Sequence, residues 1–377
     1  MNRLIRQTGN GVIILSVIIL TSCHMADPLA FETHEVDFIN KTDDIIHGTF
    51  LDIEITGGKS IAVYDTLLMI ITNNSKALLQ VFDTQTLRPI AMLCQQGRAK
   101  NEFSDNKINK SNQLFLRGGD IYIILRGEGG AVLKEINVSA SLREGHTVVE
   151  EINNSIPYGC GKVVGLDKGI NRLFTFNNHN YNIDLNEYNP PSFSIINKKS
   201  TKDIELYNRL VDFEDNIYST FWYSGSIIKH PSKNIVVQCM TTIDYIHFFD
   251  IDNDKFFSIH QIGTPRFDDI RVPNKIVDDV YEYDSSHFSE SVGTEDLFLV
   301  LYLNGEYRKN NLNQGNGEAT ELLAFDWEGN YLGGIKLDMA VHDIAYDSKR
   351  CLLYGYRIND EKIVMYNLSN FMRSIEK

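Results

Sequence analysis

The run DIDND, from Asp250 to Asp254, places three carboxylates at alternate positions, as the opening of a calcium-binding loop does. Such a loop needs glycine at its sixth position for a sharp turn and a bidentate glutamate at its twelfth. This chain has Lys255 and Gln261 at those positions. The sequence therefore predicts a solvated acidic turn at this run and not a calcium site.

Other motifs that would carry catalysis or bind a cofactor do not occur in the sequence. The ten histidines form no H-E-x-x-H pair, and there is no G-x-S-x-G nucleophile elbow. GEGG at 127–130 and GCGKV at 159–163 lack the spacing of a phosphate-binding loop. No cofactor is expected, and a non-enzymatic role is favoured.

Scattered polar and aromatic residues remain as candidates for a site. Polar side chains lie near the ends of the expected inner strands, and they are also the residues that turns need: Asn171, Asn234, Glu295, Asp296 and His342. If they met in a central channel, a metal-dependent hydrolase or lyase would be the alternative function. The aromatic run at 218–223 is able to stack on sugar rings or anchor a protein. The residues expected to face a ligand are Trp222, Tyr223, Asn171 and His342.

The first 23 residues carry the most specific motif of the chain. Arg3 and Arg6 precede VIILSVIIL at 12–20, a run of nine apolar residues, which is far below the roughly 20 that a spanning helix needs. Leu-Thr-Ser-Cys follows at 20–23 and is similar to the lipobox at which bacterial lipoproteins are cut and lipidated. We expect a signal peptide at 1–22, lipidation of Cys23 and a location on the cell envelope at the outer membrane.

Charge and cysteine content agree with an exported, well-packed body. Removal of Arg3 and Arg6 with the leader changes the formal net charge from −14 to −16, which disfavours nucleic acid as a partner. Hydrophobic residues make up 43% of the chain, enough for a full core. Export permits disulfides, and three pairings of four cysteines are open, but apolar surroundings favour buried free thiols at Cys94, Cys160, Cys239 and Cys351.

One layout of strand, turn and strand recurs along the chain. An alternating strand ends in an aromatic residue followed by Asp or Asn, and two or three turn residues then lead into another strand. The acidic or amide oxygen accepts a hydrogen bond from a backbone N–H two residues further on, so it starts the turn. Four clear copies contain Asp83, Asp250, Asp326 and Asn367, and a weaker fifth surrounds Asn137.

Short continuous apolar runs precede these copies at spacings of 51 to 63 residues: LLMII at 67, IYIIL at 121, RLFTF at 172, NIVVQ at 234, LFLVLYL at 297 and CLLYGY at 351. A continuous apolar strand is buried on both faces, so its sheet must lie between neighbours. Six such sheets predict an all-β fold, a six-bladed β-propeller with four-stranded antiparallel blades. A short helix is expected only at 201–212.

The ring also needs closing, because the last copy nearly reaches the C-terminus. GTFLDIEIT at 48–56 alternates apolar and acidic residues and is predicted to pair with the last blade as a clasp. The expected organisation is therefore a signal peptide at 1–22, a lipidated tether at 23–41 and a propeller domain at 42–377.

Several of these segments together resemble a known family. The lipobox, the six-fold repeat and the pair FDWEGNYLGGIKLD and IAYDSKRCLLYGY are similar to the TolB-like six-bladed propeller lipoproteins of the Bacteroides group. QQGRAKNEFSD at 95–105 is similar to a glycine-rich segment after the family's first blade, although only Gly97, Glu102 and Phe103 match. The resemblance implies fold and compartment and little about function, because propellers serve many activities.

We expect a monomeric binding module that contacts the membrane only through its lipid and binds an envelope protein or a glycan through one face of the ring.

Overall fold

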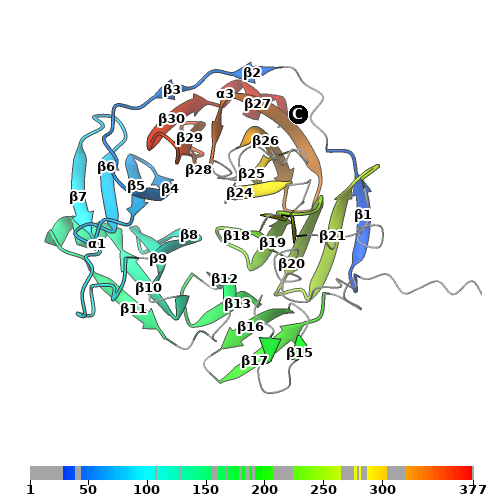
Figure 1. Cartoon of the computed structure of the whole chain (residues 1–377), viewed down its shortest axis with the longest axis horizontal. Helices are drawn as coiled ribbons and strands as arrows, with labels where there is room; N and C mark the ends of the chain where they lie inside the picture. Colours follow the sequence, from blue (N-terminus) through cyan, green and yellow to red (C-terminus); the bar gives the residue numbers. More distant parts are fainter. Residues whose placement is uncertain are drawn as a thin grey trace, which may run out of the picture.

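The fold is a ring of six antiparallel sheets, a six-bladed β-propeller (Figure 1). The computed structural model describes residues 29–38 and 44–375, apart from 107, 128–129, 155, 157–159, 167, 178–180, 183–186, 189–191, 198, 207–223, 265–275, 278–279, 282–286 and 304–318. No helix of the described part is both long enough and apolar enough to span a bilayer.

The first three blades follow one another along the chain. Blade 1 consists of β4 (Gly58–Tyr64), β5 (Leu67–Thr72), β6 (Leu79–Asp83) and β7 (Pro89–Leu93). Blade 2 consists of β8 (Asn109–Arg117), β9 (Asp120–Gly127), β10 (Val132–Asn137) and β11 (Val149–Asn153). Blade 3 consists of β12 (Cys160–Gly165), β13 (Arg172–Asn177), β16 (Ser192–Asn197) and β17 (Ser200–Ile204).

The last three blades each take a strand from the N-terminal segment. Blade 4 consists of β18 (Gly225–Lys229), β19 (Ile235–Met240), β20 (Tyr245–Asp250), β21 (Lys255–Gln261) and β1 (Glu32–Val36). Blade 5 consists of β24 (Phe288–Gly293), β25 (Leu297–Tyr302), β26 (Ala319–Asp326), β27 (Tyr331–Val341) and β2 (Ile45–Ile46). Blade 6 consists of β28 (Asp343–Asp347), β29 (Leu352–Arg357), β30 (Lys362–Asn367) and β3 (Thr49–Phe50).

The hydrophobic core explains why the ring closes. Buried side chains form six clusters, and each cluster lies between two neighbouring blades, including blade 6 and blade 1. The six apolar runs are the second strands of the blades, where both faces are covered; in β25, for example, every residue is buried. Each sheet therefore buries both of its faces only because the circle is complete.

The N-terminal belt, residues 29–38 and 44–51, runs along the outer rim of blades 4, 5 and 6 (Figure 1). β1 pairs in parallel with β21, and β2 pairs in parallel with β27. Leu29 and Phe38 are buried, and the Phe38 ring lies 5.5 Å from that of Phe325. Residues 29–38 of the tether expected over 23–41 thus form part of the propeller, because β1 pairs with the outer strand of blade 4 and Phe38 packs between blades 4 and 5.

The clasp is present, and it is shorter than expected. β3 pairs antiparallel with β30, and the N–H of Leu51 donates to the carbonyl of Ile363 at 2.9 Å. The chain then leaves the strand, and Ile53 and Ile55 turn into the core between blades 6 and 1.

Two local predictions were wrong. Of the helix predicted at 201–212, residues 201–204 belong instead to β17, because pairing with β16 overrides local helical periodicity, and residues 207–212 lie outside the described residues. Instead of a tight turn, Asn137 begins helix α1 (Val138–Glu144), with its side chain accepting from the N–H of Ala140. The chain ends with a second short helix, α3 (Ser369–Ile375).

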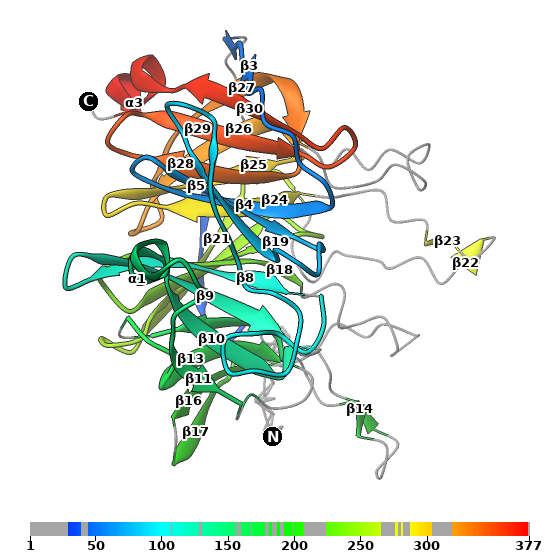
Figure 2. The ribbon, with the colours of Figure 1, turned by 90° about the vertical axis from the view of Figure 1, so that its left-hand side faces the viewer.

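The two ends of the ring differ. The hairpins β14 (Tyr181–Asn182) with β15 (Glu187–Tyr188) and β22 (Ile276–Val277) with β23 (Val280–Tyr281) project from one end, called the hairpin face (Figure 2). The opposite end, called the turn face, carries α1, α3 and the turns after the innermost strands. Because each innermost strand starts at the hairpin face, residues early in those strands lie at that end of the central channel.

Candidate functional site

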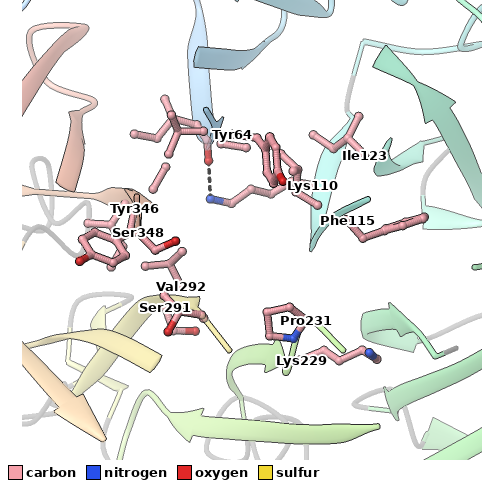
Figure 3. A pocket seen from close by; sticks show the side chains of 18 of the residues that line it. Tyr64, Lys110, Phe115, Ile123, Lys229, Pro231, Ser291, Val292, Tyr346 and Ser348 are labelled. Atoms are coloured by element: carbon pink, nitrogen blue, oxygen red, sulfur yellow. Dashed lines mark hydrogen bonds between the residues drawn. The ribbon is translucent and has the colours of Figure 1, made fainter. Parts of the chain in front are cut away.

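A cavity of about 300 Å³ lies in the central channel. The innermost strands of blades 1, 2, 4, 5 and 6 line it, together with the turns that follow some of them on the turn face (Figure 3). Its walls are mixed, with apolar side chains such as Ile61, Val292 and Ala345 beside polar ones such as Lys110 and Glu295. Small-molecule pockets are usually apolar with a few polar groups, so this cavity is more polar than most, and its volume is at the small end of the usual range.

A buried ion pair borders the cavity on the side of the hairpin face. The Lys110 ammonium lies 2.7 Å from each carboxylate oxygen of Asp343. It also donates to the Ile61 carbonyl at 2.7 Å, the dashed line in Figure 3. Only 11% of the Lys110 side chain and 2% of the Asp343 side chain are exposed. Asp343 also accepts from the N–H groups of Ile61 and Ile344. The pair therefore joins blades 1, 2 and 6 through groups that have little access to water.

Three more titratable groups share the hairpin-face end of the channel. Glu290 is the third residue of β24, Lys162 the third of β12, and His342 directly precedes β28. Glu290 is half-buried, and the Lys162 side chain is exposed. Neither Glu290 nor Lys162 forms an ion pair or hydrogen bond with another side chain of the described residues. The channel thus holds one closed ion pair and, beside it, two opposite charges that are not in contact.

Burial and neighbouring charges in the channel shift the pKa of both Asp343 and Glu290. Burial raises the pKa of Asp343, and the nearby Glu290 charge adds to this, while Lys110 acts in the opposite direction. Burial also acts to raise the pKa of Glu290, but the positive charges of Lys162 and Lys110 outweigh it. The pKa of Glu290 consequently lies below its ordinary value, so this carboxylate is ionised at neutral pH.

Polar groups also border the cavity on the side of the turn face. His230 is buried, and its Nδ1 accepts from the N–H groups of Ser232 and Lys233, each at 3.1 Å. Burial lowers the pKa of His230, which keeps the imidazole neutral. Ser232 donates to Glu295 at 2.6 Å, and this exposed carboxylate lies at the rim. The rim at this end is therefore fixed by local turn hydrogen bonds.

A second polar cluster joins blades 4 and 5. Nδ1 of His287 lies 2.5 Å from Oδ1 of Asp244, and the Tyr302 hydroxyl donates to the same oxygen at 3.0 Å. Asp244 is buried, and burial together with its charge raises the pKa of Tyr302. The cluster connects the turn at 241–244 to the first and second strands of blade 5, so it orients one blade against the next.

The residues predicted from the sequence are dispersed. Trp222 and Tyr223 lie outside the described residues. Asn171 is exposed on the turn face and donates to Glu151 of blade 2 at 2.7 Å, away from the cavity. His342 lies at the channel beside Glu290.

The other polar residues that were singled out serve mostly in turns. Asn234 donates to Asp252, and Asp296 is exposed in the turn that follows β24. Only Glu295 of this set borders the cavity. No three His, Cys, Asp or Glu side chains of the described ranges are grouped as metal ligands.

The repeated acidic residues act as turn formers, as predicted. Asp83 accepts from the N–H groups of Gln85 and Thr86, and Asp326 accepts from those of Glu328 and Asn330. Asp250, the first residue of DIDND, accepts from the N–H of Asn253. All four cysteines at 94, 160, 239 and 351 are free, and the first three are buried.

The channel charges were not singled out from the sequence. Lys110, Lys162 and Glu290 each stand two or three residues into an inner strand, where a charged residue is unexpected unless it faces the axis. That placement is a usable signal only once the first strand of every blade has been located. The role of Asp343 could not be recognised from the sequence either, because the IAYD segment that follows it indicates only the start of a strand.

Comparison with known proteins supports the fold alone. No protein-family model matches the chain, and no curated protein matches it. Among solved structures, a "putative exported protein" from Bacteroides fragilis matches with a TM-score of 0.51 at 12% identity, over 89% of this chain and 98% of that one. The β-propeller domain of Cps50 (Swd1) from Myceliophteria thermophila gives a TM-score of 0.43 at 12% identity, over 85% of this chain and 100% of that one. The sheet topology and the channel define the class of this protein as a six-bladed propeller with a charged, cavity-bearing channel.

Proposed function

We propose that this chain is a lipid-anchored, non-enzymatic binding module of the cell envelope that holds a small molecule in its central channel. The observation that carries the proposal is the cavity of about 300 Å³, with walls that are partly apolar and partly polar and the Lys110–Asp343 pair at one end. Apolar surface supplies affinity, and the few fixed polar groups supply orientation. Propellers are suited to binding ligands on their axis because every blade contributes to it.

The location rests on the N-terminal segment. The leader, the lipobox-like Leu-Thr-Ser-Cys and the acidic composition favour a TolB-like propeller lipoprotein attached through Cys23 to the outer membrane. The similar Bacteroides fragilis structure is that of a protein described as exported, which is in keeping with this location. A monomer is expected, and the projecting hairpins offer a surface for an envelope protein or a glycan.

Occupation of the cavity is tested with benzene as an apolar probe, measured by ligand-observed NMR. Ala345 is buried in the wall, so Ala345→Phe would fill the space and abolish binding. Ala131→Phe, at an exposed turn of blade 2, is the matched control and should bind benzene as the wild type does. Lack of benzene binding to the folded wild type, or equal binding by Ala345→Phe, would disprove a ligand cavity.

Anchoring is tested by fractionation. We expect Cys23→Ala to move the protein from the membrane fraction to the soluble one, because the lipid on Cys23 is the only membrane attachment proposed for the mature chain. Serine substitution at Cys94, which is buried in the core, serves as a control that keeps Cys23. Unchanged membrane association of Cys23→Ala would show that the lipid is not the anchor.

A further inference from the structure

The belt begins at a fixed point on the outer rim, where blades 3 and 4 meet. Leu29 is buried in the hydrophobic cluster that joins these two blades. The N–H of Ala30 donates to the carbonyl of Leu206, just beyond β17, at 2.7 Å, and the Phe31 ring stacks 5.1 Å from that of Phe256 in β21. The start of the belt is therefore attached to both blades.

Only a short linker, residues 24–28, joins this point to the expected lipidation site. Leu29 is the sixth residue after Cys23. An extended chain advances by about 3.5 Å per residue, so the Cα atoms of Cys23 and Leu29 are at most about 20 Å apart. A lipidated cysteine lies at the bilayer surface, because its acyl chains are buried in the hydrocarbon. The junction of blades 3 and 4 must then stay within about 20 Å of the lipid headgroups.

The outermost strands at this rim, β1 and β17, present a polar surface. Their exposed side chains are those of Glu32, His34 and Glu35 in β1 and of residues 200–203 in β17. Such groups lose free energy when they leave water without a partner, so this rim can meet the headgroup layer and not the hydrocarbon.

Exposed apolar side chains lie on the other side of the ring. Ile90 and Met92 belong to β7, the outermost strand of blade 1, which lies across the ring from blade 4 (Figure 1). Apolar contact with lipid would therefore favour that rim. The short linker instead favours the rim between blades 3 and 4, so the two causes predict opposite orientations.

We propose that the rim formed by β1 and β17 faces the membrane, with the lipid headgroup layer as its partner. This inference rests on the proposed attachment through Cys23 and adds the orientation that the attachment imposes. The linker keeps this rim beside the bilayer, while blades 6 and 1, on the other side of the ring, point away from it (Figure 1).

Fluorescence quenching on vesicles measures which rim faces the lipid. The lipidated protein is bound to phosphatidylcholine vesicles in which part of the lipid carries a nitroxide on its headgroup, and a fluorophore is attached to one introduced cysteine. Glu32→Cys probes β1, and Met92→Cys is the matched exposed position on the outermost strand of blade 1. Both are made together with Cys351→Ser, because Cys94, Cys160 and Cys239 are buried. The fluorophore at position 32 should lose its fluorescence, and the one at position 92 should keep it.

A longer linker tests whether the reach of the chain is the cause. Insertion of about 20 Gly and Ser residues between Asp27 and Pro28 raises the extended reach to about 90 Å. The ring can then turn freely, so the loss of fluorescence at position 32 should fall to the level at position 92. An undiminished loss at position 32 would show that the linker does not orient the ring.

The outcomes separate this inference from the proposed anchoring. Quenching at position 92 that equals or exceeds quenching at position 32, with the natural linker, would overturn the orientation. If Cys23→Ala is released from the membrane in that case, the lipid anchor stands and only the orientation is wrong. If Cys23→Ala stays on the membrane, the anchor itself is wrong, and the inference fails with it.

Discussion

Removing one member of the Lys110–Asp343 pair should destabilise the propeller more than removing both. The change to make is Asp343→Asn, which removes the charge and keeps an acceptor oxygen for one of the Ile61 and Ile344 N–H groups. It leaves the Lys110 ammonium, 11% exposed, without a carboxylate in direct contact. Breaking a buried pair in this way costs about 3–5 kcal/mol, because one charge stays buried and uncompensated.

The double variant provides the decisive comparison. Lys110→Met keeps most of the length of the apolar side chain, so Lys110→Met with Asp343→Asn should recover to within about 1–2 kcal/mol of the wild type. Urea unfolding followed by circular dichroism gives the free energies, and Tm of Asp343→Asn should fall by about 4–7 °C for a chain of this length. The coupling energy of the cycle should then be at least about 2 kcal/mol.

An exposed pair serves as the matched control. Lys202 lies 2.9 Å from Asp254 with 61% and 68% of the side chains exposed, so its coupling energy should stay below about 1 kcal/mol. A cost for Asp343→Asn below about 1 kcal/mol, or a double variant as unstable as the sum of its parts, would refute the claim that this pair is buried and mutually dependent.

Three further predictions concern the belt, acid stability and thiol reactivity. Phe38→Ala should lower the free energy of unfolding by about 3–5 kcal/mol, because Phe38 is fully buried against blade 5. Limited proteolysis of this variant should then release the N-terminal segment. Proteolysis at the wild-type rate would contradict a stabilising contact between the belt and blade 5. Burial lowers the pKa of His247 to about 3, so the unfolded chain, with an ordinary pKa near 6.5, binds the proton first. Stability should therefore fall as the pH drops from about 6.5 toward 3, by up to about 1.4 kcal/mol per pH unit, and His247→Gln should show a shallower slope in urea titrations. Burial raises the pKa of Cys94 to about 12, so iodoacetamide should label it only after unfolding, and rapid labelling of the native protein at about pH 8 would contradict its placement.

The blade pattern was readable from the sequence because its cause is local. A run such as LFLVLYL needs cover on both faces wherever it lies, and Asp83 or Asp326 starts a turn through its own neighbouring N–H groups. Six repeats of that unit are satisfied by a closed ring. The length of the clasp, by contrast, depends on its pairing with β30, which lies far away in the sequence. The belt strands form only because the outer edges of β21 and β27 are available for pairing.

The candidate site could not be read in the same way. Lys110 and Asp343 are 233 residues apart, and nothing near either one in the chain indicates the other. The conformation of residues 201–204 was also not predictable from the local sequence. Their local pattern favours a helix, but their hydrogen bonds to β16 make them a strand.

The sequence by itself determined that six doubly covered sheets follow one another and that Asp side chains form several of their turns, and it predicts an export leader at 1–22 that is cut before Cys23. Only the tertiary structure decided which charges meet on the axis, because closing the ring brings the starts of six innermost strands to one level of one channel. Hydrophobic periodicity is a local pattern that can be read from consecutive residues, whereas an ion pair between distant blades forms only when the ring has closed.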